Sequence, residues 1–167
     1  MWALPAEGAR GEFPELVRAL SGEERAGGSP AAVRALLWIR LRLGALLGLD
    51  DPRSGVGSRV HTLRERLPAD IPPASGPPAP GSLGFQTVYE LPDEWAQEIA
   101  NRTVHAVLHL GWVPVAEGRY RGQMAILVKP NGVTGRAYMA AIRPFRHLIV
   151  YPAMLERIER VWNERAL

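Results

Sequence analysis

The chain has no cysteine, and this absence excludes disulfide bonds and thiol nucleophiles from any account of its function. A serine hydrolase is also excluded, because all six serines precede the strand-rich half and none has a GxSxG setting. Phosphate-binding loops of the GxGxxG or GxxxxGK[ST] type are missing as well. The sequence therefore predicts no hydrolase triad, no dinucleotide loop and no cofactor.

Lysine and long apolar runs are also scarce. Lys129 is the only lysine among 20 cationic residues, and the net charge of +3 is spread over both halves of the chain. Because the sequence has no basic arm, nucleic acid is not expected as a partner. Because the first five residues lack a charged segment and an apolar run, we expect no signal peptide, and the lack of cysteine fits a reducing compartment. A length of 167 residues suits one domain, so we predict a single cytoplasmic domain over 1–167.

The first half predicts helices and a long connection. Residues 1–29 predict a loop and one short helix at Phe13–Leu20. A serine followed by a proline starts a Leu-rich helix at 30–49, which is apolar around most of its circumference. This pattern indicates a buried helix whose arginines reach solvent; an interfacial membrane helix is the alternative, although membrane contact is not expected. A short helix is expected around Val60–Leu67, and the proline-rich stretch 68–84 predicts a surface excursion.

The second half predicts an antiparallel sheet. Phe85–Tyr89 is a short β-rich run, and Leu91–Ile99 reads as a turn that leads into a helical turn or an edge segment. Polar and apolar residues alternate from Thr103 to Val113, which indicates a strand with one buried face. After a glycine turn, Tyr120–Lys129 alternates in the same way. A third strand of this central group is expected at Gly135–Ile142.

The C-terminal segment predicts a long helix. Pro144 suits a helix start, and apolar residues recur at helical spacing after Pro152. Pro152 would kink a helix over 144–165; the alternative makes His147–Tyr151 a fourth strand and begins the helix at Pro152. We favour the kinked helix, which is long enough to cross a sheet face. The fold class is therefore α+β, an antiparallel sheet packed on a long C-terminal helix.

Two histidines raise the question of a metal site. His105 and His109 form an HxxxH pair, which would chelate a metal ion if the segment were a helix. On a strand this spacing separates the two residues by about 13 Å, too far for one ion. We therefore expect no metal site, and two solvent-facing or edge histidines.

Polar side chains beside apolar walls are the candidate ligand-binding residues. Tyrosine, histidine and arginine in such places orient carbonyl or phenol groups, and a desolvated His or Glu can move a proton near neutral pH. The structural alternative is that the arginines cap the sheet–helix junction, the tyrosine hydroxyls reach solvent and Glu90 pairs with an arginine. No catalytic residue is assigned. The candidates are Tyr89, Glu90, Tyr120, Met124, Tyr138, Arg143, Arg146, His147 and Tyr151.

Eight short strings of the sequence resemble the bacterial DUF2867 family. They are spread over nearly the whole chain, and the C-terminal block is the specific part of the resemblance. The strings are Trp2–Pro5, Phe13–Arg18, Ser58–Val60, Asp93–Trp95, Asn101–His105, Tyr120–Met124, Val128–Gly132 and Tyr138–Pro152.

The resemblance implies a helix-grip fold, similar to START and Bet v 1-like proteins, in which a curved antiparallel sheet wraps a long C-terminal helix around a cavity. It implies no catalytic residues. The family is common in actinobacteria and is similar to a domain appended to some NAD(P)-binding epimerase-like proteins. Its members usually carry a first strand ahead of the position that matches Trp2. A sheet without that strand would have an exposed edge, which favours a homodimer.

These expectations lead to one functional hypothesis and two alternatives. The hypothesis is a domain that binds a small, largely apolar molecule in a sheet–helix cavity, with proton-transfer or cyclisation chemistry as an extension. Its polar anchors would be Tyr120, Tyr138, Arg143 and His147. The first alternative is a non-enzymatic interaction or dimerisation module that uses helix 30–49 or an open sheet edge. The second is a peripheral membrane or lipid-transfer role.

Overall fold

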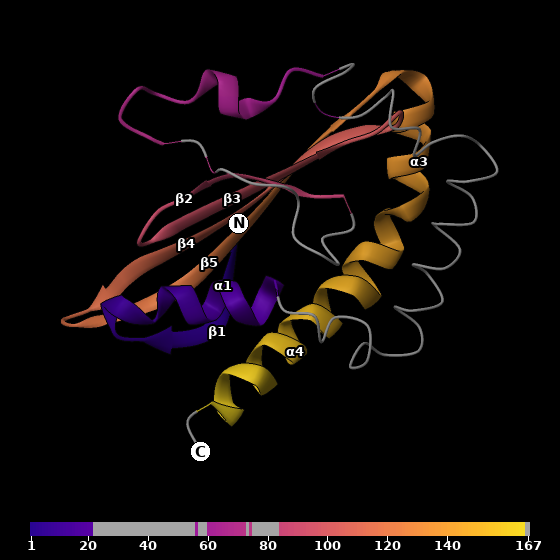
Figure 1. Cartoon of the computed structure of the whole chain (residues 1–167). Helices are drawn as coiled ribbons and strands as arrows, with labels where there is room; N and C mark the ends of the chain where they lie inside the picture. Colours follow the sequence, from indigo (N-terminus) through magenta and orange to yellow (C-terminus); the bar gives the residue numbers. More distant parts are fainter. Residues whose placement is uncertain (22–55, 57–59, 73, 75–83, 166–167) are drawn as a thin grey trace.

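Five antiparallel strands form one curved sheet in the order β1-β5-β4-β3-β2 (Figure 1). The computed structural model describes residues 1–21, 56, 60–72, 74 and 84–165. Since β1 pairs with β5 and β2 pairs with β3, the first two strands in the chain are the two edges of the sheet. The strands are β1 (Trp2–Gly8), β2 (Gln86–Glu90), β3 (Glu94–Ala100), β4 (Val104–Ala116) and β5 (Arg119–Pro130).

Short helices follow β1 and precede β2, and a long helix follows β5. The short ones are η1 (Arg10–Glu12), α1 (Phe13–Ser21) and η4 (Leu63–Arg66), a 3₁₀ helix inside the predicted Val60–Leu67 segment. The predicted helix at Phe13–Leu20 is thus confirmed. The long helix consists of α3 (Gly132–Phe145), η5 (Arg146–Val150) and α4 (Tyr151–Glu164). None of the helices in the described part of the chain is both long and apolar enough to cross a bilayer.

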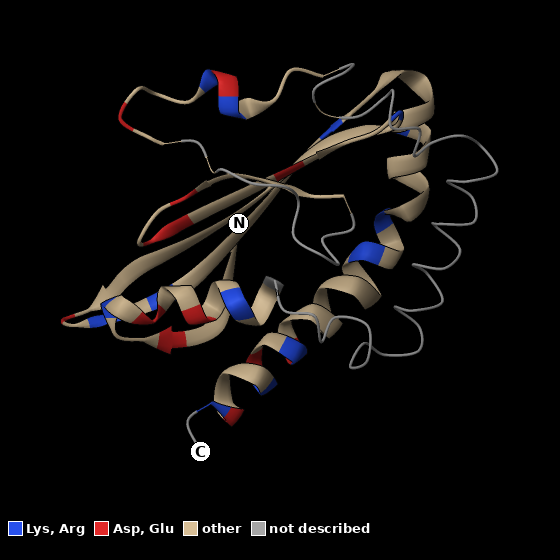
Figure 2. Cartoon of the chain, viewed as in Figure 1, with Lys and Arg blue, Asp and Glu red and all other residues tan. Residues whose placement is uncertain are grey.

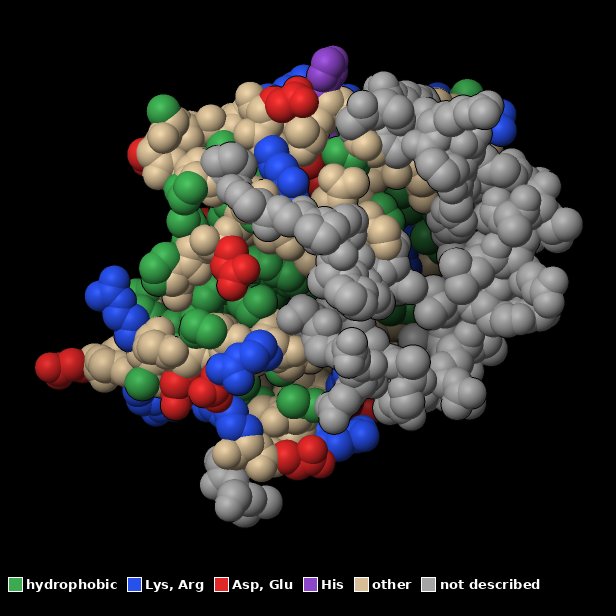
Figure 3. Space-filling view, in the orientation of Figure 1, with side chains coloured by type: hydrophobic (Ala, Val, Ile, Leu, Met, Phe, Trp, Pro, Cys, Tyr) green, Lys and Arg blue, Asp and Glu red, His purple; other side chains and the backbone are tan. Residues whose placement is uncertain are grey.

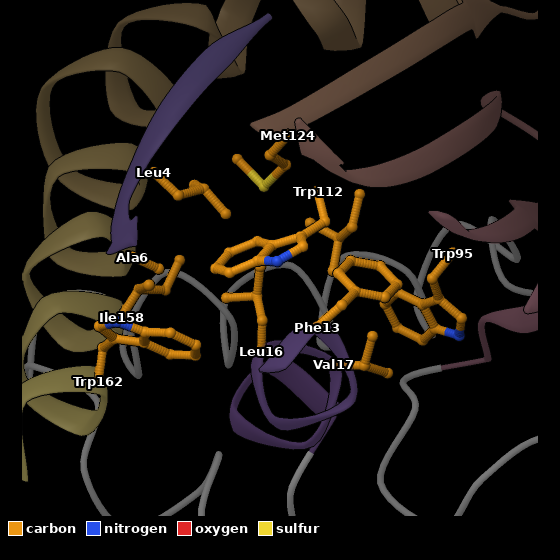
Figure 4. Close-up of a cluster of buried hydrophobic side chains, with 11 residues drawn as sticks. Leu4, Ala6, Phe13, Leu16, Val17, Trp95, Trp112, Met124, Ile158 and Trp162 are labelled. Carbon is orange, nitrogen blue, oxygen red and sulfur yellow. The ribbon is translucent and has the colours of Figure 1, made fainter. Parts of the chain in front are cut away.

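A cluster of aromatic and aliphatic side chains fills the space between the sheet, α1 and α4 (Figure 4). Strand register places its sheet members on one face, since Leu110 lies opposite both Met124 and Trp95. The face predicted to be buried from alternation over β4 is therefore confirmed. The cluster comprises Leu4, Ala6, Phe13, Leu16, Val17, Trp95, Leu110, Trp112, Met124, Ile158 and Trp162.

The helix predicted over 144–165 is confirmed, but it begins earlier, at Gly132, and spans 33 residues. Its middle is a π-helical turn, in which the Tyr151 N–H donates to the Arg146 carbonyl five residues back. This wide turn precedes Pro152, which has no N–H to donate and whose ring would crowd a regular turn. Figure 1 shows the helix axis bending here. The alternative that made His147–Tyr151 a strand is wrong.

Three further predictions need correction. The strand expected at Gly135–Ile142 is the first half of α3, and the third strand of the central group is β3 instead. The helical turn expected within Leu91–Ile99 is wrong, because β3 occupies most of that segment between β4 and β2. The loop expected before Phe13 contains β1. The helix predicted at 30–49 lies outside the described residues, as do residues 73 and 75–83 of the proline-rich stretch.

The start of the long helix is fixed by close contact with the β3–β4 turn. The Asn131 N–H donates to the Thr103 carbonyl over 2.7 Å, and the Gly135 N–H donates to the Asn131 carbonyl over 3.0 Å. Gly135 lies so near Thr103 that an added Cβ atom would be 2.2 Å from the Thr103 oxygen. The absence of a side chain at Gly135 therefore allows α3 to turn back over the sheet directly after β5.

Gly135→Ala is expected to destabilise the fold, because the new Cβ atom would force α3 and the β3–β4 turn apart. Overpacking of this kind typically costs about 1–3 kcal/mol. Gly11→Ala is the control, since no heavy atom lies within 4 Å of the Cβ position there. Urea unfolding of the two variants measures the difference, and equal midpoints would contradict the close contact.

Candidate functional site

The inner face of the sheet is densely filled at one end and only partly covered at the other. The filled end carries the aromatic cluster next to α1 and α4. Toward α3 the aliphatic side chains Val104, Leu108, Ile126 and Val128 are half-buried. They share the inner face, since Leu108 lies opposite Ile126 and Val128 lies opposite the buried Ala106. Figure 3 shows hydrophobic side chains gathered over the strands beside α1. An apolar wall thus continues beyond the filled cluster.

Three of the candidate ligand-binding residues come together at the π-helical turn. Tyr151 is 6% exposed, and its hydroxyl oxygen accepts hydrogen bonds from Arg146 Nε at 2.9 Å and from Arg146 Nη2. The guanidinium carbon lies 5.3 Å from the Tyr151 ring centre, and the His147 ring meets the same ring edge-on at 5.3 Å. Trp2 of β1 packs on Tyr151, with 4.7 Å between ring centres. An aromatic and cationic cluster therefore borders the filled core.

Two candidates lie at the opposite edge of the sheet. Tyr89 and Glu90 belong to β2, whereas Trp2, which packs on Tyr151, belongs to β1. Three strands lie between these two edges, so β1 and β2 are about 19 Å apart at the usual spacing between strands. Tyr89 and Glu90 therefore do not share a site with Tyr151.

The other four candidates are spread between the core and the long helix. Met124 is 1% exposed within the filled cluster, and Tyr120 is half-buried against that cluster. Tyr138 is half-buried and Arg143 is exposed on α3. Of these four, Tyr138 and Arg143 belong to the helix that faces the half-buried aliphatic wall.

A buried carboxylate on the outer face of the sheet had not been expected from the sequence. Glu98 is 0% exposed and accepts hydrogen bonds from the Thr62 hydroxyl and from the Leu63 N–H, the latter at 3.0 and 3.2 Å to its two oxygens. His105 Nε2 lies 3.0 Å from Glu98 Oε2, and its side chain is 16% exposed. Glu98 therefore fastens η4 to the sheet, and the expectation of a solvent-facing or edge histidine is wrong for His105.

A second carboxylate–histidine contact lies on the same outer face. Glu94 Oε2 accepts a hydrogen bond from the Tyr89 hydroxyl at 3.2 Å and lies 3.4 Å from His109 Nε2. Burial and then the negative charge of Glu94 raise the pKa of Tyr89 to about 12. Glu94 and His109 border a hollow of about 370 Å³ that residues of β3, β4 and β5 also line.

A larger groove, of about 530 Å³, runs between β1 and α4. Its walls include Pro5 and Leu155, but Glu7, Arg121, Glu156 and Glu159 also line it. A hydrogen bond from Arg121 holds the pKa of Glu7 below its ordinary value. Because small-molecule sites are mostly apolar with few polar groups, this charged groove fits a largely apolar ligand poorly. Among the residues that the structure describes, no three histidine or carboxylate side chains gather to hold a metal ion.

Comparison with known proteins identifies the family. Residues 1–153 match the family described as "Protein of unknown function (DUF2867)". The chain belongs to the DUF2867 family. Neither the curated proteins nor the solved structures contain a match to it. The likeness of this DUF2867 protein to START and Bet v 1-like proteins therefore stays a prediction.

Two of the strings that resemble DUF2867 build the junction between the sheet and the long helix. Asn101 Oδ1 accepts hydrogen bonds from the Thr103 N–H at 2.9 Å and from the Thr103 hydroxyl at 2.8 Å, which closes the β3–β4 turn. Asn131 Nδ2 donates to the Asn101 carbonyl over 3.0 Å. These strings therefore determine where α3 starts and how it faces the inner wall.

Glu98→Gln is expected to destabilise the protein strongly. The substitution places an amide nitrogen among donors and removes one of the two buried acceptor oxygens that the Leu63 N–H and His105 face. A buried donor that loses its acceptor in this way costs about 1–3 kcal/mol. Glu94→Gln is the control, since Glu94 is half-exposed, and its cost should be about 1 kcal/mol or less. Equal losses in urea unfolding would contradict the structural role of Glu98.

Tyr89 should ionise at a higher pH than an ordinary tyrosine side chain in an alkaline titration followed by near-ultraviolet absorbance. Its pKa in the folded protein, about 12, exceeds the ordinary 10.0. The stability that this hydroxyl contributes is therefore complete below pH 10 and is lost as the pH rises through about 12. Glu94→Gln removes the nearby charge and should lower the Tyr89 pKa part of the way. An unchanged titration in that variant would contradict the assignment.

Proposed function

We propose that this protein binds a small, largely apolar molecule between the inner face of the sheet and the helix α3–η5. The observation that carries the proposal is the half-buried wall of Val104, Leu108, Ile126 and Val128, beside an otherwise densely filled core. Binding sites for such molecules are concave, mostly apolar and supplied with a few polar groups. A ligand would cover apolar surface of these four side chains, which are only half-buried.

Side chains of the long helix would form the other wall of the proposed site, facing the sheet. Tyr138, Met139, Ile142 and Ile149 are half-buried on α3 and η5. Arg146, His147 and Tyr151 form the polar end of this wall. We therefore take these residues, together with the four aliphatic residues of the sheet, as the ligand-binding set.

The inner face of β3 adds one polar group to the sheet wall. Gln97 is 3% exposed and lies opposite Leu108, and its Nε2 donates to the Thr87 hydroxyl over 3.4 Å. One buried amide among aliphatic side chains would orient a ligand without making the site hydrophilic.

Proton transfer or cyclisation would be a further property of the same site. His147 is the histidine of the Tyr151 cluster, whereas His105 and His109 are paired with glutamates on the outer face. We therefore assign any such chemistry to His147, as an extension of the binding proposal.

The covered sheet edges favour ligand binding over dimerisation through an open sheet edge; the other route to dimerisation, through helix 30–49, lies outside the described residues. Arg64 Nε donates to the Thr87 carbonyl over 2.7 Å, and the Ala74 N–H donates to the Val88 carbonyl over 3.0 Å, so part of β2 is already bonded. Helix α4 packs along β1, and Trp162 Nε1 donates to the Glu7 carbonyl over 3.0 Å. These contacts leave little of either edge for pairing with another strand.

Ile126→Trp tests the binding proposal, because a larger side chain on the inner wall should occupy the ligand's space. An uncharged naphthylamine dye, whose emission rises in apolar surroundings, serves as the probe. We expect the variant to bind this dye roughly tenfold or more weakly than the parent protein. Leu127→Trp is the matched control, since Leu127 is the next residue, lies on the outer face and is 59% exposed.

Two results would contradict the proposal. One is the absence of dye binding by the parent protein, and the other is an equal loss of binding in the Ile126 and Leu127 variants. If Ile126→Trp does not fold, as judged by circular dichroism, Leu108→Phe provides a smaller obstruction on the same wall and is expected to weaken binding in the same direction.

A further inference from the structure

We infer that the ligand carries a carboxylate and that Arg146 and Tyr151 bind it. The inference rests on the proposed function, since it concerns the polar end of the same site. It assigns the ligand to a chemical class, the amphipathic carboxylic acids, which have one anionic end and an apolar body.

The hydroxyl group of Tyr151 has a proton that it can donate to a ligand. Its oxygen accepts hydrogen bonds from two nitrogens of Arg146, so its own proton has to point away from the guanidinium. Among the described residues, Tyr151 forms side-chain hydrogen bonds only with Arg146, and in both of them its oxygen is the acceptor. Tyr151 is 6% exposed, so a ligand that reaches its hydroxyl group would take the place of water there. An acceptor atom on the ligand would then receive this proton.

The guanidinium group of Arg146 has one nitrogen that does not contact Tyr151. Nε and Nη2 donate to the Tyr151 hydroxyl oxygen, and Nη1 does not. None of the ion pairs between described residues includes Arg146. Arginine N–H groups bind carboxylates through short, charge-assisted hydrogen bonds. The Nη1 group and the Tyr151 hydroxyl together offer donors to the two oxygens of one carboxylate.

The charge of the whole helical wall agrees with an anionic ligand. Residues 132–155 contain Arg136, Arg143 and Arg146 but no Asp or Glu. Figure 2 shows this as blue without red along α3, with red beginning only on α4. The rings of Trp2 and Tyr151 pack together beside Arg146, and a charge-assisted hydrogen bond next to such apolar surface is stronger than in water.

The number of donors favours a carboxylate over a phosphate ester. One guanidinium and one hydroxyl match two acceptor oxygens, whereas a phosphate presents three oxygens and more negative charge. The half-buried aliphatic wall on the sheet matches the apolar body of such an acid. An amine is the opposite case, because the arginines of α3 would repel it.

The experiment compares three molecules with the same alkyl chain: dodecanoic acid, dodecanol and dodecylamine. Isothermal titration calorimetry on the full chain, below the concentrations at which these molecules aggregate, measures each affinity. We expect the acid to bind about tenfold more tightly than the alcohol, and the amine to bind most weakly. Arg146→Gln should lower the affinity for the acid about tenfold and leave the affinity for the alcohol unchanged.

The control and a second variant keep the test decisive. Arg160→Gln removes an exposed arginine of α4 and should change none of the affinities. Tyr151→Phe removes only the hydroxyl and should also weaken the acid selectively, so it replaces Arg146→Gln if that variant does not fold. Equal affinities for acid and alcohol, unaffected by either substitution, would overturn the carboxylate inference and leave the binding proposal standing. Binding of none of the three molecules would overturn both.

Discussion

The contact between Trp112 and Trp162 is the interaction on which the rest of the fold depends. The indole rings lie 5.7 Å apart, one on the central strand β4 and the other on α4. Each ring N–H donates over 3.0 Å to a backbone carbonyl near the end of β1, Trp112 to Ala9 and Trp162 to Glu7. Two large apolar rings are thus buried without leaving a polar group unpaired. The two indoles therefore connect β4 and α4 with the end of β1, and Phe13 of α1 also packs on Trp112.

Fixing the long helix at both ends explains why the inner face is unevenly filled. Trp162 and Ile158 hold its C-terminal end in the filled cluster, and Gly135 holds its start against Thr103. Between these points the π-helical turn and Pro152 bend the axis, which a regular helix would not do. The aliphatic wall beneath α3 therefore remains half-buried. The proposed ligand site follows from this geometry, with Tyr151 at the boundary between the two parts.

The strands with strict alternation were predictable from sequence, and the elements without it were not. Alternation over β4 and β5 predicts both strands, because each has one apolar face. β3 carries Glu98 toward the outer face and Gln97 toward the inner one, and both are buried. When polar residues occur on both faces of a strand, polar and apolar residues no longer alternate, and the strand is not recognised from its sequence. Their burial depends on Thr62, His105 and Thr87, which no local pattern reveals.

Small residues account for the other errors. Gly132 and Gly135 resemble a turn followed by a strand, yet Gly135 is required by its contact with Thr103, and the alanines that follow favour a helix. β1 was missed because Pro5 and Gly8 lower the strand propensity of a short segment. Among the candidate site residues, Arg146, His147 and Tyr151 lie within one turn of the long helix and contact one another, and their closeness in the sequence makes this proximity predictable. That Tyr89 and Glu90 lie at the other edge of the sheet follows from the strand order, which no local pattern reveals.

We propose that, among the described residues, the end of the interior beneath α3 binds a ligand and the end beside α1 does not. Solution NMR of the protein with labelled Ile, Leu and Val methyl groups, titrated with dodecanoic acid, distinguishes the two ends. We expect shifts at the methyl groups of Val104, Leu108, Ile126 and Val128, with little change at Leu16 and Leu110 of the filled cluster. Shifts of equal size in both groups, or shifts confined to outer-face residues such as Leu127, would contradict it.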